Sequence, residues 1–158
     1  MNILLAGFKG ADNSSKLILD GSSGGFEKLY LENDFDISSK QIRDAIIGGK
    51  YGLILALGQK PVIKSIYIET TAKGHGAVLN TRYDYNSLAS YLKNNGYKTK
   101  ISNNAGNYLC NHVYFQGLSA IEHAGSSADM LFLHVPTVKN NPNTLCISSA
   151  ISLFLEKH

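Results

Sequence analysis

The chain has 158 residues, of which 44% are hydrophobic and 17% are charged, a composition typical of a globular protein and unlike that of a disordered one. This length predicts one domain, residues 1–158, with a core that needs neither disulfides nor metals. The net charge is +3, but only two of the fifteen basic residues are arginines and the lysines are scattered singly, so a nucleic-acid-binding surface is not expected.

Short apolar runs rich in Ile, Leu, Val and Tyr alternate along the chain with segments of helical spacing. The runs predict buried strands over residues 2–8, 27–31, 51–57, 64–69, 97–102 and 129–134. The helical spacing predicts helices over 39–47, 86–95, 105–123 and 143–156. Residues 10–25 predict a short helix or an ordered loop, and residues 71–85 show little periodicity.

This alternation decides the predicted fold class. Strands that are apolar on both faces and alternate with helices favour a parallel sheet covered by helices. We therefore predict an α/β protein, a single-domain three-layer α/β/α sandwich with a mostly parallel, twisted sheet.

The sequence shows no membrane or export signal. The apolar opening over residues 3–8 is too short for a signal peptide and lacks a preceding basic region, and no apolar run approaches the roughly 20 residues of a membrane span. We expect a cytoplasmic protein with both cysteines reduced. The sequence contains neither a CxxC nor an HExxH motif, and its five histidines are dispersed, so no metal site is expected.

Three chemically competent side chains lie at or just after the ends of separate predicted strands. Glu69 ends one strand, His134 ends another, and Cys110 lies near the start of the helix that follows a third. Ligands of open α/β sheets bind beyond the carboxyl ends of the strands, where these side chains are expected to meet. A thiol, an imidazole and a carboxylate are the components of a cysteine hydrolase.

Each of these residues also has a purely structural interpretation. Cys110 lies on an apolar stripe, where a free cysteine is commonly a core residue. His134 could bond a backbone carbonyl, and Glu69 could be an ordinary surface glutamate. Among the remaining candidates, His75 between two glycines is a rival base, and Cys146 is predicted to be a buried, inert thiol in the middle of a helix.

Several motifs of this sequence resemble those of one known family. The run SNNAGNYLCN at 102–111 resembles the S-x-x-A-G-x-[YF]-[VL]-C-N active-site signature of pyroglutamyl peptidase I, and HVP at 134–136 resembles its catalytic H-V-P. Four further motifs resemble those of the family and follow in the same order along the chain, namely GF at 7–8, NSS at 13–15, GQ at 58–59 and IYIE at 66–69.

The resemblance implies a cysteine exopeptidase of the omega-peptidase type that removes N-terminal pyroglutamyl residues from peptides without a cofactor. It assigns the nucleophile to Cys110, the general base and acid to His134, and the orienting carboxylate to Glu69. It also implies self-association and a small, largely uncharged pocket for the lactam ring. The expected substrate-binding residues are Phe8, Asn13, Gln59, Tyr108 and Leu109.

The chain departs from the family pattern around this pocket. The opening G-F-x-P-F-G-G is replaced by GFKGADN at 7–13, and G-Q-A-G-G-R by GQKPVI at 58–63. The family arginine ten residues after the glutamate falls on Leu79, which leaves Arg82, three residues further on, as the candidate for oxyanion support.

Three function hypotheses follow. The first is the pyroglutamyl peptidase. The second is a catalytically impaired member of the same fold that binds small amides, or a related amidase with another substrate. A nucleotide-binding protein is disfavoured, because no strand is followed by a GxGxxG or GxxxxGK[ST] motif.

Overall fold

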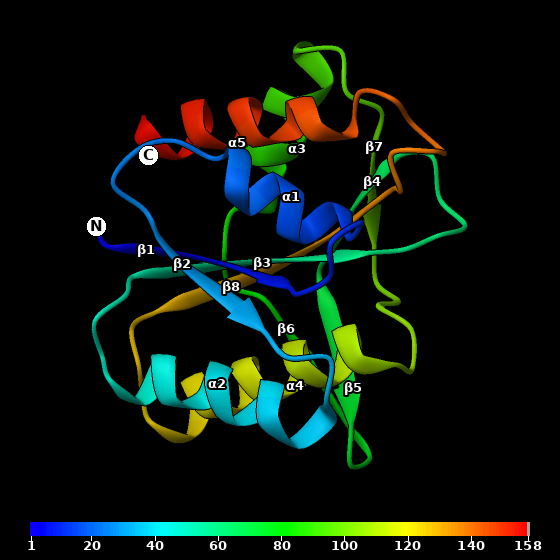
Figure 1. Cartoon of the computed structure of the whole chain (residues 1–158). Helices are drawn as coiled ribbons and strands as arrows, with labels where there is room; N and C mark the ends of the chain where they lie inside the picture. The colour runs from blue at the N-terminus through cyan, green and yellow to red at the C-terminus, as the bar shows by residue number, and fades with distance from the viewer. Residues whose placement is uncertain (158) are drawn as a thin grey trace.

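The computed structural model describes residues 1–157 and shows a sheet between two layers of helices (Figure 1). The sheet has six strands in the order β2-β1-β3-β8-β4-β7, and β5 and β6 form a separate two-stranded sheet. The strands are β1 (Ile3–Phe8), β2 (Glu27–Leu31), β3 (Leu53–Gln59), β4 (Ile66–Glu69), β5 (Thr71–Gly74), β6 (Ala77–Asn80), β7 (Thr99–Ser102) and β8 (Asp129–Val135).

Five α-helices and one 3-10 turn complete the part of the chain that the structure describes. They are α1 (Ser14–Gly21), α2 (Phe35–Ile47), α3 (Tyr85–Asn94), α4 (Leu109–His123), the turn η1 (Thr144–Cys146) and α5 (Ile147–Glu156). In Figure 1, α1, α3 and α5 cover one face of the sheet, and α2 and α4 cover the other. Two hydrophobic clusters, one on each face, fill the spaces between these layers. The predicted three-layer α/β/α sandwich is therefore confirmed.

The sheet is mostly parallel, as predicted. Every neighbouring pair of strands in the six-stranded sheet is parallel except β8 and β4, which are antiparallel. The central strands β1, β3 and β8 carry almost only buried side chains, because helices cover both of their faces. The single antiparallel pair matters for the site, because it reverses the direction in which β4 delivers its last residue.

The low-periodicity stretch over residues 71–85 contains regular structure that its sequence pattern did not indicate. Residues 71–80 form the β5–β6 hairpin, whose turn includes His75 and Gly76, both with positive φ. The hairpin lies against α4, where the side chain of Asn111 accepts a bond from the amide of Lys73 (3.0 Å) and donates one to its carbonyl (2.8 Å). The strands are short and partly exposed, which is why their sequence carries no strong alternation.

No helix within residues 1–157 is long and apolar enough to cross a membrane. The longest, α4, has 15 residues, fewer than the roughly 20 that a bilayer core requires.

Candidate active site

A cavity of about 400 Å³ opens where β3 and β8 end and α4 begins. Its position agrees with the rule that ligands of open α/β sheets bind at the carboxyl ends of the parallel strands. Its walls come from the β3–β4 connection, the loop before α4, the first turn of that helix and the end of β8. They are formed by Gln59, Lys60, Pro61, Ala105, Gly106, Asn107, Tyr108, Leu109, Cys110 and His134.

A buried histidine–glutamate pair lies at this cavity. The Nδ1 atom of His134 is 2.8 Å from Oε1 of Glu69, and the two residues are 3% and 0% exposed. A carboxylate can only accept, so in this pair Nδ1 carries the hydrogen and Nε2 is left as the basic nitrogen. The imidazole is thereby held in the tautomer that a general base needs.

The route by which Glu69 reaches His134 differs from the prediction. We expected Glu69 and His134 to meet because parallel strands end at one edge of the sheet, but β4 runs antiparallel to β8. Tyr67 lies opposite His134, and Glu69 lies opposite Phe132, two residues further in from the edge. Glu69 therefore reaches the imidazole diagonally from inside the sheet, which explains why its side chain is fully buried.

The backbone of Glu69 is fixed from α4. The hydroxyl of Tyr114, which is fully buried, donates a hydrogen bond of 2.8 Å to the Glu69 carbonyl. The second carboxylate oxygen, Oε2, has no hydrogen-bond partner within residues 1–157. A buried carboxylate with one unbonded oxygen is poorly solvated, so a positive charge that forms on the adjacent imidazole stabilises it.

Cys110 lies in the first turn of α4 and its sulfur reaches β3 at Gly58. A Cβ atom added to Gly58 would lie 2.5 Å from the Cys110 sulfur and 2.9 Å from the ring of Phe132. Only glycine therefore fits here without displacing the thiol. This contact gives a physical reason for the glycine in the GQ step, which the sequence alone did not reveal.

The surroundings of Cys110 favour the neutral thiol over the thiolate. Burial raises the pKa of Cys110 to about 12, the nearby Glu69 carboxylate acts in the same direction, and the Lys60 ammonium opposes them. The first turn of α4 has no side-chain cap, since Tyr108 at the cap position makes no such bond. Its free N–H groups can therefore face developing negative charge.

Gln59, Tyr108 and Leu109 lie in the cavity wall, as expected for substrate-binding residues. Tyr108 is 77% exposed at the rim. The Oε1 atom of Gln59 accepts from the backbone N–H of Ser14 (2.9 Å) and from its hydroxyl (3.0 Å), which ties the start of α1 to the end of β3.

Phe8 and Asn13 lie elsewhere, so the structure does not support their expected place in the pocket wall. Phe8 is 3% exposed within the core, and its N–H donates to the hydroxyl of Ser15. Asn13 is the N-cap of α1, and its side-chain oxygen accepts from the Ser15 N–H at 3.0 Å. Both residues shape the α1 entry rather than line the cavity.

The expectation that Arg82 supports the oxyanion was wrong. Its Nη2 donates to the Ala128 carbonyl at 2.7 Å, and its Nε lies 3.3 Å from the carboxylate of Asp129. Asp129 begins β8 and His134 is five residues along that strand, a separation of about 16 Å. Arg82 therefore lies near the opposite end of the strand from the cavity.

Two further expectations are corrected by the structure. Cys146 is exposed in the 3-10 turn before α5, not buried in the middle of a helix. His75, the rival base, lies in the β5–β6 turn with its ring 5.8 Å from that of Phe115, and it is not part of the cavity wall. Within residues 1–157 no group of three or more His, Cys, Asp or Glu side chains is placed to hold a metal ion.

Sequence reasoning missed Lys60 and Asn111. Lys60 follows the GQ step and lies in the cavity wall. The family pattern is rich in glycine over this run, and here a lysine takes one of its places. Asn111, the residue after the cysteine, is buried and fastens the hairpin onto α4. A polar residue inside the apolar pattern of α4 was the available signal for it.

A mostly parallel α/β sandwich with a cysteine at a helix start and a buried His–Glu pair at one cavity is typical of the α/β cysteine peptidases. A family model described as pyroglutamyl peptidase matches residues 75–155, just over half of the chain. The chain belongs to this family of cysteine peptidases.

Curated relatives agree with this assignment. A pyrrolidone-carboxylate peptidase of Oceanobacillus iheyensis is 39% identical over 70 residues, which make up 44% of this chain and 33% of that protein. One from Lacticaseibacillus paracasei is 24% identical over 148 residues, 80% of this chain and 69% of that protein. The stronger of these two matches thus spans about a third of the relative's length.

Solved structures share the fold over nearly the whole chain. Pyrrolidone carboxyl peptidase from Thermus thermophilus has a TM-score of 0.82 at 20% identity, with 98% of each chain covered. A mutant of the Pyrococcus furiosus enzyme has a TM-score of 0.81 at 21% identity, with 99% of this chain and 97% of that chain covered.

Proposed function

We propose that this protein is a cysteine exopeptidase that removes an N-terminal pyroglutamyl residue from peptides. The observation that carries the proposal is the buried His134–Glu69 pair beside a cavity that also contains the Cys110 thiol. Membership of the pyroglutamyl peptidase family supplies the substrate class.

The proposed reaction begins with proton transfer from Cys110 to Nε2 of His134 as the sulfur attacks the pyroglutamyl carbonyl. The raised pKa of Cys110 favours a transfer that accompanies the attack, because burial disfavours a free thiolate. The Glu69 carboxylate stabilises the imidazolium that forms, and the N–H groups of the first α4 turn face the oxyanion. His134 then protonates the leaving amine, and water hydrolyses the thioester to free pyroglutamate.

The test is hydrolysis of a fluorogenic pyroglutamyl amide under reducing conditions, with Cys110→Ala and Cys146→Ala compared. We expect Cys110→Ala to lose at least about a thousandfold in kcat/KM, since the nucleophile is gone. Cys146 is exposed and is not part of the cavity wall, so Cys146→Ala should keep wild-type activity. Full activity of Cys110→Ala would overturn the proposal.

The second candidate is a protein that binds small amides without turning them over. It is favoured by the raised pKa of the half-buried Cys110 thiol and by the position of Arg82 away from the cavity. Pyroglutamate would then raise the melting temperature of a protein that is inert on pyroglutamyl amides. Turnover that depends on Cys110 excludes this candidate.

A further inference from the structure

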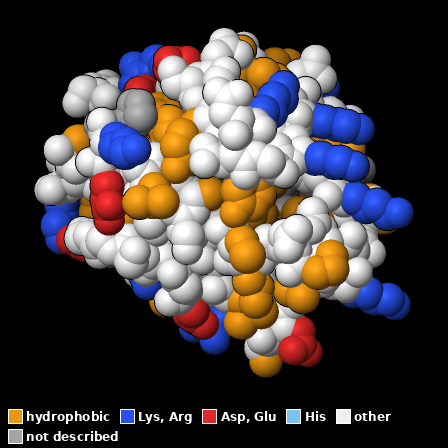
Figure 2. Space-filling model, turned by 90° about the horizontal axis from the view of Figure 1, so that it is seen from above, with side chains coloured by type: hydrophobic (Ala, Val, Ile, Leu, Met, Phe, Trp, Pro, Cys, Tyr) orange, Lys and Arg blue, Asp and Glu red, His pale blue; other side chains and the backbone are white. Residues whose placement is uncertain are grey.

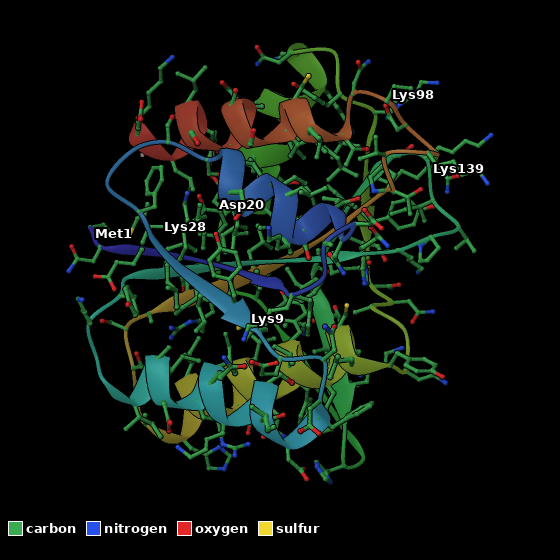
Figure 3. All side chains as sticks on the ribbon, in the orientation of Figure 1. Met1, Lys9, Asp20, Lys28, Lys98 and Lys139 are labelled. Atoms are coloured by element: carbon green, nitrogen blue, oxygen red, sulfur yellow. The ribbon has the colours of Figure 1, made fainter. Side chains whose placement is uncertain are left out.

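The end of the sheet that holds the cavity is lined with lysines. Lys and Arg side chains follow one another along the right-hand edge of the molecule in Figure 2, and Lys98 and Lys139 project at that end in Figure 3. Lys60 in the cavity wall and Lys100 on β7 both lie against one aromatic ring. The Nζ atoms of both are 5.7 Å from the centre of the Tyr67 ring.

Strand register explains how this arrangement arises beside the candidate catalytic residues. Gly58, His134, Tyr67 and Lys100 lie opposite one another in a row across β3, β8, β4 and β7. Directly paired residues point to the same face of a sheet, so these side chains share the face that α4 covers. Lys60, two residues after Gly58, returns to the same face at the cavity wall.

Both ammonium groups lack an acidic partner. Four lysines elsewhere are ion-paired, namely Lys9, Lys16, Lys40 and Lys50. Within residues 1–157, neither Lys60 nor Lys100 has a carboxylate within ion-pair distance. The acidic group at the cavity, Glu69, is buried and already bonded to His134. Two like charges held beside one ring repel each other unless an anion joins them.

The chemistry of the leaving group says which part of a substrate meets these lysines. His134 gives its proton to the leaving amine, so the residue after the scissile bond must pass beside His134. Tyr67 is the direct neighbour of His134 on β4, and the Nζ atoms of both lysines lie near its ring. A leaving residue that passes His134 on its β4 side would therefore meet Tyr67 and the two ammonium groups, which lie beside the cavity wall.

We propose that Lys60, Tyr67 and Lys100 form a subsite for an acidic residue directly after the pyroglutamyl group, so that pyroglutamyl-glutamyl and pyroglutamyl-aspartyl peptides are the preferred substrate class. This proposal rests on the proposed function. Tyr67 supplies a flat apolar wall for the methylene groups of the acidic side chain, and the two ammonium groups bind its carboxylate.

The first experiment compares kcat/KM for two isosteric peptides, pyroglutamyl-glutamyl-alanine amide and pyroglutamyl-glutaminyl-alanine amide. At low salt we expect the glutamyl peptide to be preferred by about tenfold, and the preference to shrink towards parity near 1 M salt, where the screening length is about 3 Å. Lys60→Gln and Lys100→Gln should each lower the ratio by about threefold. Lys139→Gln makes the same charge change at the same end of the molecule and should leave the ratio unaltered.

Two outcomes of this comparison overturn the subsite. One is a ratio of one or less in the wild type. The other is an equal loss of kcat/KM on both peptides in Lys60→Gln. That result would place the Lys60 ammonium at the scissile bond and not beside the leaving residue.

The second experiment separates this subsite from the proposed function. Affinities of the same two peptides for Cys110→Ala protein, measured by calorimetry, need no turnover. Tighter binding of the glutamyl peptide, with an affinity ratio that falls in Lys100→Gln, supports the subsite even if the wild type hydrolyses neither peptide. Failure of the wild type to hydrolyse either peptide would overturn the proposed function alone. Equal affinities in a protein that hydrolyses pyroglutamyl amides overturn the subsite alone.

Discussion

Glu69→Gln is the substitution that tests the candidate catalytic machinery most directly. The amide has nearly the same shape as the carboxylate but carries no charge, and its NH₂ group can donate to Nδ1 of His134. The ring hydrogen would then move to Nε2, the nitrogen that must accept the thiol proton. The substitution therefore removes both the charge that stabilises the imidazolium and the correct tautomer.

The magnitude follows from the geometry. With Nδ1 and Oε1 2.8 Å apart, the centres of charge of imidazolium and carboxylate are about 4 Å apart, and at an effective dielectric constant near 20 their attraction is about 4 kcal/mol. If this attraction is realised only in the transition state, kcat/KM falls by about a thousandfold. Because Oε2 makes no hydrogen bond, we expect the free energy of unfolding to change by less than about 2 kcal/mol.

The assay is hydrolysis of a fluorogenic pyroglutamyl amide, with urea unfolding of the same samples. Asp129→Asn is the matched control, since it makes the same charge change at the other end of β8, where Asp129 pairs with Arg82. A Glu69→Gln enzyme within tenfold of the wild type in kcat/KM would refute the reasoning.

Further predictions concern the surroundings of the thiol. Gly58→Ala adds a Cβ 2.5 Å from the Cys110 sulfur, so urea unfolding should show a loss of about 1–3 kcal/mol in the free energy of unfolding. Thiol-dependent hydrolysis should fall as well. A variant with unchanged stability and activity would contradict the contact. Asn111→Ala removes both bonds to the Lys73 backbone, so amide exchange at Lys73 should accelerate by at least tenfold, and equal protection would show that the hairpin is held otherwise. Iodoacetamide should label Cys146 before Cys110, because Cys146 is exposed and burial raises the pKa of Cys110. Mass spectrometry of the labelled peptides gives the order of labelling, and the reverse order would contradict this prediction. Because the pKa of Cys110 is raised in the folded protein, the unfolded chain loses this proton at a lower pH. The free energy of unfolding should therefore fall as pH rises above about 9, by about 1.4 kcal/mol per pH unit. Cys110→Ala should flatten that slope.

Local sequence patterns were sufficient for the sandwich. The runs that became β1, β3 and β8 are short and apolar on both faces over most of their length, as expected for strands buried on both faces. The helices that cover them follow from amphipathic spacing. The chemical types of the candidate catalytic residues were also readable from the sequence, because a cysteine, a histidine and a glutamate lie at or just after the ends of predicted strands.

The relations between distant segments were decided by tertiary structure. Strand direction is a non-local property, so the sequence did not reveal that β4 runs against β8 and delivers Glu69 from inside the sheet. The same reason applies to Arg82, whose place near the start of β8 depends on the path of the chain after the hairpin. The alignment of Lys60, Tyr67 and Lys100 likewise exists only once the register of β3, β8, β4 and β7 is set, because Lys60 follows β3, Tyr67 lies on β4 and Lys100 lies on β7.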